Sequence, residues 1–123
     1  MNLENIRADL LAKKGTTEDT PFGPDALVFK VMGKMFALLA WQETPLRVTL
    51  KCDPDLASTL RAEYKAIQPG YYMNKKHWNT LTLDGSIPDE KVQGLTDLSY
   101  RLVVKGLKKA ERQKLEQLEI GGG

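Results

Sequence analysis

The order of apolar and polar positions predicts helices and strands that alternate irregularly along the first half of the chain. An apolar stripe at helical spacing predicts an N-terminal helix over residues 3–14, and residues 15–25 have the composition of a loop. Residues 26–32 and 35–41 are rich in strand-forming side chains. They predict two strands joined by a two-residue turn at Gly33-Lys34.

The second half of the chain continues this pattern with longer helices. Residues 46–52 alternate between apolar and polar side chains, which predicts a strand with one face in water. Asp53 followed by Pro54 is typical of a helix start, and Pro69-Gly70 is expected to end this helix. Residues 79–83 alternate again, and a last long helix is expected to open at Pro88.

The resulting order, α-β-β-β-α-β-α, predicts an α+β fold in which helices cover one face of an antiparallel sheet of at least four strands. No linker or repeat divides the sequence, so we expect a single domain over residues 1–118 and a flexible tail at 119–123. The uncovered face of the sheet would be available to a partner.

Composition limits the kinds of function to consider. A hydrophobic fraction of 41% and a charged fraction of 28% are ordinary for a soluble domain, and no apolar run is long enough to cross a membrane. The N-terminus has no signal-peptide core, and the single cysteine, Cys52, fits a reducing compartment; we therefore expect a cytoplasmic protein. One cysteine and one histidine are too few for the usual zinc or iron ligand sets, so no metal or cofactor is expected.

Positive charge is concentrated near the C-terminus although the net charge is only +2. Residues 99–114 contain six basic residues and one acidic residue. Within this segment Arg101, Lys105, Lys108 and Arg112 would form one basic stripe if the last helix continues through them. A stripe of this kind is most often a solvated helix face, but it is also typical of a surface that binds phosphates.

The segment PGYYMNKKHW, residues 69–78, combines aromatic, amide and basic side chains. Adjacent tyrosines in an extended segment point to opposite sides, so Tyr72 or its neighbour can stack on a base while the other is buried. Asn74 is suited to a turn or to a polar contact, and Lys75 and Lys76 have no acidic neighbour in the sequence. His77 beside two lysines is more often a structural hydrogen-bonding group than a catalytic base.

No motif for catalysis stands out. The chain has no glycine pattern that cradles phosphates and no serine in a nucleophile-elbow pattern, and Cys52 has the features of a small buried residue. We therefore expect that the protein is not an enzyme. A catalytic role for His77 as a general base stays open, but no partner residue can be named for it.

Three blocks of the sequence, VFKVMGKMFALLAW, PGYYMNKKHWNTL and LSYRLVVKGLKKAERQKL, resemble the MmcQ/YjbR family of small bacterial proteins. The similarity extends from about residue 22 to residue 115. The resemblance implies a fold similar to the frataxin homologue CyaY. It also implies DNA binding, because members of this family are commonly described as DNA-binding by analogy with a double-wing module.

Together these observations predict a DNA-binding protein without catalytic activity, and a monomer is favoured. Cations on the strands and the loop would contact phosphates, and the residues expected in this site are Lys30, Lys34, Lys51, Tyr72, Asn74, Lys75, Lys76, His77, Arg101 and Lys105. The alternative is a module that uses the same cluster to bind a protein carboxylate or a small anion.

Overall fold

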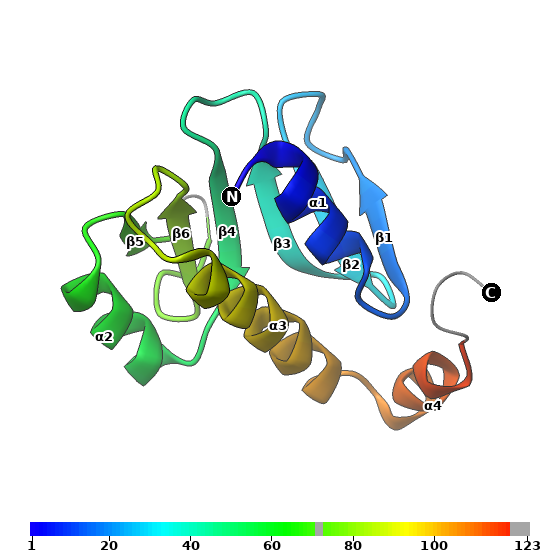
Figure 1. Ribbon diagram of the computed structural model, residues 1–123. Helices are drawn as coiled ribbons and strands as arrows, with labels where there is room; N and C mark the ends of the chain where they lie inside the picture. Colours follow the sequence, from blue (N-terminus) through cyan, green and yellow to red (C-terminus); the bar gives the residue numbers. More distant parts are fainter. Residues whose placement is uncertain (71–72, 119–123) are drawn as a thin grey trace.

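The computed structural model describes residues 1–70 and 73–118. These residues form four helices and a six-stranded sheet (Figure 1). The elements, in chain order, are α1 (Leu3–Leu11), β1 (Thr16–Asp19), β2 (Leu27–Val31), β3 (Lys34–Ala40), β4 (Arg47–Lys51), α2 (Pro54–Glu63), β5 (Ile67–Pro69), β6 (Trp78–Thr82), α3 (Asp89–Lys105) and α4 (Lys109–Gln117).

The sheet has the order β1-β2-β3-β4-β6-β5, and every neighbouring pair is antiparallel. Helices α1, α2 and α3 lie on one side of it, and α3 crosses β3 and β4 (Figure 1). The hydrophobic core fills the space between these layers and includes Ile6, Leu10, Phe29, Phe36, Leu39, Leu50, Leu60 and Leu81. The predicted α+β class and the antiparallel sheet with helices on one face are therefore confirmed.

Two edge strands were not predicted, so the observed order differs from α-β-β-β-α-β-α. Residues 16–19, expected as a loop, form β1 and pair with β2 from Thr16 opposite Val31 to Asp19 opposite Val28. The second helix ends at Glu63 rather than continuing toward Pro69, because residues 67–69 pair with β6 as the short strand β5. Both strands are polar or very short, and neither gives a clear strand pattern in the sequence.

The turn between β2 and β3 lies one residue earlier than predicted. Its two central residues are Met32 and Gly33, with φ of 49° and 78°, and Lys34 is the first residue of β3. Positive φ at both positions gives the twist that suits a two-residue hairpin turn. A register shift between Phe29 and Lys30 adds one residue to β3, and this bulge accounts for the displaced turn.

A serine of α3 joins β3 and β4 where their regular pairing ends. The ladder between the two strands extends only to Ala37 opposite Leu50. Beyond it, the fully buried Ser99 hydroxyl donates to the Phe36 carbonyl oxygen at 2.5 Å and accepts from the Lys51 N–H at 2.8 Å. Ser99 thus supplies partners for two backbone groups that the bulge separates.

The basic C-terminal segment is divided between two helices. Helix α3 ends at Lys105, and α4 begins at Lys109 with the Glu111 carboxylate accepting from the Lys108 N–H at 3.1 Å. The buried side chain of Leu115 anchors α4 against the turn after α1: a Cβ placed on Gly15 would lie 2.6 Å from Leu115 Cδ1. Because the helix does not continue, the predicted basic residues do not form one stripe on a single helix.

Candidate nucleic-acid interface

The end of β4 and the segment before β6 bring part of the predicted site together. Lys51 pairs with Trp78 across the two strands, and the Cys52 N–H donates to the His77 carbonyl oxygen at 2.7 Å. Lys75 and Lys76 are exposed in the adjoining turn. Within residues 1–70 and 73–118, neither these two lysines nor Lys51 forms an ion pair.

An arginine of α2 holds this turn in place. Arg61 donates through Nε to the Asn79 side-chain oxygen at 2.7 Å and through Nη2 to the carbonyl oxygen of Lys75. Gly70 is also required, because a Cβ there would lie 2.6 Å from Trp78 Cβ and 3.0 Å from the Trp78 carbonyl oxygen. Sequence reasoning missed Arg61, since an arginine on a helix surface gives no signal of such a contact.

The polar residues of the turn stabilise the turn itself. The Asn74 side-chain oxygen accepts from the Lys76 N–H at 2.9 Å, and its carbonyl oxygen accepts from the His77 N–H at 3.2 Å. The structural role that the sequence allowed for Asn74 therefore accounts for both of its oxygens. Tyr72, the predicted stacking residue, lies outside the described residues.

Lys30 is neutralised within the sheet. Phe29 and Val31 belong to the core, so Lys30 between them points to the face without helices, where its ammonium lies 3.6 Å from the Asp19 carboxylate of β1. This ion pair connects two strands that are adjacent in the sheet. Lys30 is accordingly a weaker candidate for a phosphate contact than the unpaired lysines.

The remaining predicted cations lie elsewhere. The β2–β3 turn, which precedes Lys34, lies toward α4 and away from β6 (Figure 1). Arg101 and Lys105 are exposed on α3, each two residues after a buried residue (Ser99 and Val103), which places them on the side of the helix turned away from the sheet. Arg101 and Lys105 therefore face away from the sheet, whereas the cluster around His77 lies where β4 ends and β6 begins.

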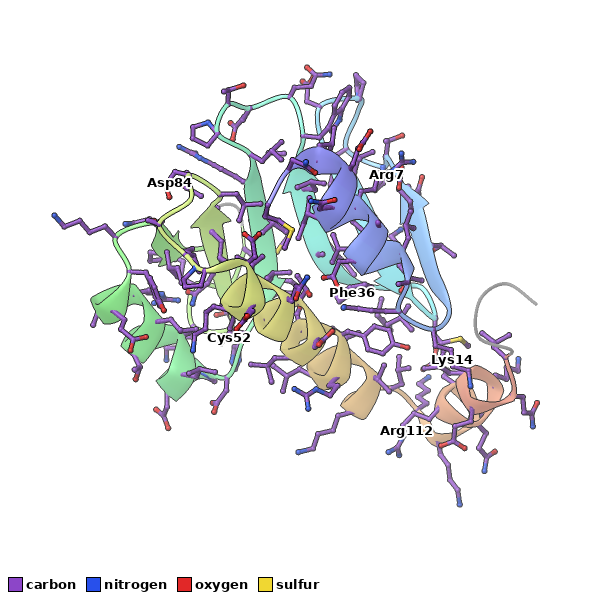
Figure 2. All side chains as sticks on the ribbon, viewed as in Figure 1. Arg7, Lys14, Phe36, Cys52, Asp84 and Arg112 are labelled. Carbon is purple, nitrogen blue, oxygen red and sulfur yellow. The ribbon has the colours of Figure 1, made fainter. Side chains whose placement is uncertain are left out.

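Arg101 and Lys105 join a larger basic region, which we call the α3–α4 surface. All six of its members are exposed, and none forms an ion pair with another described residue: they are Arg101, Lys105, Lys108, Lys109, Arg112 and Lys114. Between residues 101 and 118 only Glu111 and Glu116 are acidic. Figure 2 shows Arg112 on α4, at the side of the molecule away from β5 and β6.

The sequence signal for this surface was the local excess of basic residues, but only Arg101 and Lys105 were selected from it. The four omitted residues lie at or beyond the end of α3, where the sequence did not settle whether the helix continues. The structure shows that they are exposed on a separate helix that is anchored to the rest of the fold through Leu115.

The described residues offer few starting points for covalent chemistry. Burial, with a smaller effect from the nearby Asp53 carboxylate, raises the pKa of the Cys52 thiol, which disfavours the reactive thiolate. In the described ranges, no three side chains among His, Cys, Asp and Glu are grouped so that they could hold a metal ion. Among these same residues there is no helix of sufficient length and apolar character to span a bilayer.

Comparison with known proteins gives a consistent family assignment. The sequence model of the YjbR family matches residues 11–102. The Escherichia coli K12 protein YjbR is 34% identical over 118 residues, covering 96% of this chain and all of the relative. The protein YbdF of Escherichia coli O157:H7 is 37% identical over 95 residues, which are 77% of this chain and 78% of that protein.

Solved structures agree with the fold described above. A crystal structure of a Deinococcus radiodurans protein superposes with a TM-score of 0.89 at 39% identity, covering 99% of this chain and 94% of the other. A Pseudomonas syringae protein of known crystal structure gives a TM-score of 0.72 at 29% identity, covering 83% of this chain and 98% of the other. On the sequence matches and this structural similarity, the chain belongs to the YjbR family.

Proposed function

We propose that this protein binds DNA through the phosphate backbone and catalyses no reaction, with the α3–α4 surface as its main contact. The observation that carries the proposal is the exposure of six basic side chains on two consecutive helices without an acidic partner in the described residues. A local excess of unpaired cations is the electrostatic footprint expected for binding to a phosphate backbone.

The position of Lys108 and Lys109 supports a binding role over a role in stability. They are the N-cap and the first residue of α4, where the helix dipole already provides partial positive charge. Cations at this end destabilise a helix by about 0.3–1 kcal/mol each, whereas a phosphate there interacts favourably with the lysines and with the helix dipole. Helix stability therefore gives no reason for lysines at these two positions.

The dependence of affinity on salt tests the proposal. We expect a labelled DNA duplex to bind with log K falling by about 0.9 for each tenfold increase in salt and each phosphate contacted. Four contacts would weaken binding about 150-fold between 50 and 200 mM salt. Fluorescence anisotropy titrations at several salt concentrations measure this slope.

The double variant Lys108→Glu/Lys109→Glu identifies the surface. Acidic residues suit a helix N-terminus, so α4 is expected to be retained while two phosphate contacts are lost and the slope becomes about 1.8 shallower. Lys65→Glu/Lys91→Glu is the matched control, because it makes the same change in charge at exposed residues near β5 and the start of α3. An unchanged slope in the first variant, or an equal loss in the control, contradicts the proposal.

The predicted contacts around His77 are tested by the same titration. Because Lys75 and Lys76 are not part of the α3–α4 surface, we expect Lys75→Glu/Lys76→Glu to bind duplex with nearly the wild-type slope. If this variant instead removes the salt dependence and Lys108→Glu/Lys109→Glu does not, the site is at the turn. A saturable rise in melting temperature with phosphate that persists at high salt would favour the alternative of a small-anion module.

A further inference from the structure

The face of the sheet without helices contains a hollow of about 1050 Å³. This volume slightly exceeds the range typical of small-molecule sites, about 300–1,000 Å³. Leu38 and Ala40 of β3 and Thr49 of β4 are among the residues on its strand side, and Phe22 and Met73 line it from two loops. A flat sheet surface beside an exposed aromatic ring and a thioether is suited to a planar, largely apolar group.

Phe22 gives a second reason to consider this site. Its side chain is 70% exposed, the largest value among the exposed large hydrophobic residues of the described chain. It lies in the loop between β1 and β2 and lines the hollow, so it is an aromatic surface without a covering partner in the described residues. A ligand ring stacked on Phe22 would remove this apolar area from water.

Two residues that line the hollow are followed closely in the sequence by lysines without ion pairs. Thr49 lines it, and Lys51, two residues later on the same face of β4, continues in the direction of Trp78. Met73 also lines it and is followed two and three residues later by Lys75 and Lys76. Strand β4 and the segment before β6 thus each run from the hollow to a lysine beyond it, and β4 also places Arg47 in the lining.

Acidic groups mark the opposite side of the hollow. Asp25 and Glu43 belong to the loops after β1 and β3, which lie at the end of the sheet away from Trp78. The Glu43 carboxylate lies 3.5 Å from Arg47, which also lines the hollow, whereas Asp25 forms no ion pair with a described residue. An anion is therefore favoured at the lysine side, and groups that donate hydrogen bonds are favoured at the loop side.

We propose that the hollow binds a small aromatic anion of the nucleotide type. Its planar ring would lie against Phe22 and Met73 over β3, and its phosphate would contact Lys51, Lys75 and Lys76. Amino groups on the ring would donate to the carboxylates at the loop side. This site is distinct from the α3–α4 surface and does not depend on DNA binding there.

The test uses adenosine 5′-monophosphate as the probe, with adenosine and ribose 5-phosphate as its two halves. We expect the monophosphate to raise the melting temperature with saturation and to bind at least tenfold more tightly than either half, because ring and phosphate contact different parts of the site. Phenyl phosphate and benzoate serve as smaller aromatic anions. Isothermal titration calorimetry gives the affinities.

Variants locate the ring and the phosphate separately. Phe22→Ala is expected to weaken the monophosphate about tenfold and to leave ribose 5-phosphate unchanged, whereas Lys75→Glu/Lys76→Glu should weaken both compounds. Leu11→Ala, an equally simple truncation of an exposed apolar residue on α1, is the control and should change neither. Ala40→Phe adds a ring on the strand side of the hollow, where the ligand ring would lie, and is expected to weaken all three aromatic anions.

Two results would overturn the inference. One is binding of the monophosphate and ribose 5-phosphate with equal affinity, which would mean that no ring occupies the hollow. The other is the absence of saturable binding by all three aromatic anions up to about 10 mM, a concentration that detects even millimolar sites. Either result leaves the proposed DNA binding unaffected, since that is measured with Lys108→Glu/Lys109→Glu and duplex.

Discussion

Replacement of Ser99 by alanine is expected to lower the free energy of unfolding far more than the same replacement at an exposed serine. Its hydroxyl contacts the Phe36 carbonyl oxygen and the Lys51 N–H, and Ser99 has no exposed surface. Both backbone groups lie beyond the last paired position of β3 and β4. Alanine therefore leaves a buried donor and a buried acceptor without this shared partner.

The magnitude follows from the two groups that are left unpaired. A buried polar group without a partner costs about 1–3 kcal/mol, so the free energy of unfolding should fall by about 2–4 kcal/mol after some relaxation. The unfolding entropy of about 2.1 cal/mol/K per residue converts 1 kcal/mol into about 4 °C for a chain of 123 residues. We thus expect the melting temperature to decrease by roughly 8–16 °C.

Urea unfolding followed by circular dichroism measures this change, and hydrogen exchange of the Lys51 amide reports it locally. Ser58→Ala is the matched control, because Ser58 is exposed on α2 and alanine there should alter stability by less than about 0.5 kcal/mol. If Ser99→Ala is as stable as this control, or if the Lys51 amide keeps its protection, Ser99 does not bridge the strands as described.

Three further changes test the site and the core. Gly70→Ala should destabilise the protein by about 2 kcal/mol or more, because the new Cβ meets Trp78 at 2.6 Å, whereas Gly94→Ala, with nothing within 4 Å, should stabilise α3 by up to about 1 kcal/mol in the same urea titration. Arg61→Met should cost about 1–3 kcal/mol by leaving a buried amide oxygen unpaired, and heteronuclear NMR should show altered amide shifts in residues 74–78. Burial raises the pKa of Cys52, so the folded state disfavours the thiolate, and stability should decline as pH rises above about 8.5. Cys52→Ala should lack this decline in urea midpoints measured from pH 7 to 10, and an identical decline would contradict the assignment.

The sequence predicts the central strands of this fold well, and its edge strands and helix ends poorly. Strands β3, β4 and β6 bury alternate or continuous apolar residues, and their predicted ranges lie within two residues of the observed ones. Residues 16–19 are threonines and acids, whose strand conformation depends on pairing with β2 rather than on a local pattern. The turn at Met32 depends on a bulge inside β3, which no local pattern reveals.

The grouping of charged residues was less predictable than the fold. Lys30 and Asp19 are eleven positions apart, and only the pairing of β1 with β2 brings them within 3.6 Å. Arg101 and Lys105 were expected beside His77, but the side of α3 that they occupy depends on how the helix packs on the sheet. The sequence shows the local excess of basic residues near residue 108. Which of the basic side chains form ion pairs can be seen only in the folded structure.

Both edge strands of the sheet have features that disfavour pairing with a strand of another chain. On one side β5 has three residues and ends in Pro69, which has no N–H to donate. On the other, β1 is only four residues long, and its last two residues are engaged in ion pairs, Glu18 with Arg7 and Asp19 with Lys30, so this edge is short and charged. We therefore expect the protein to stay monomeric at high concentration, a property that sedimentation equilibrium can measure directly.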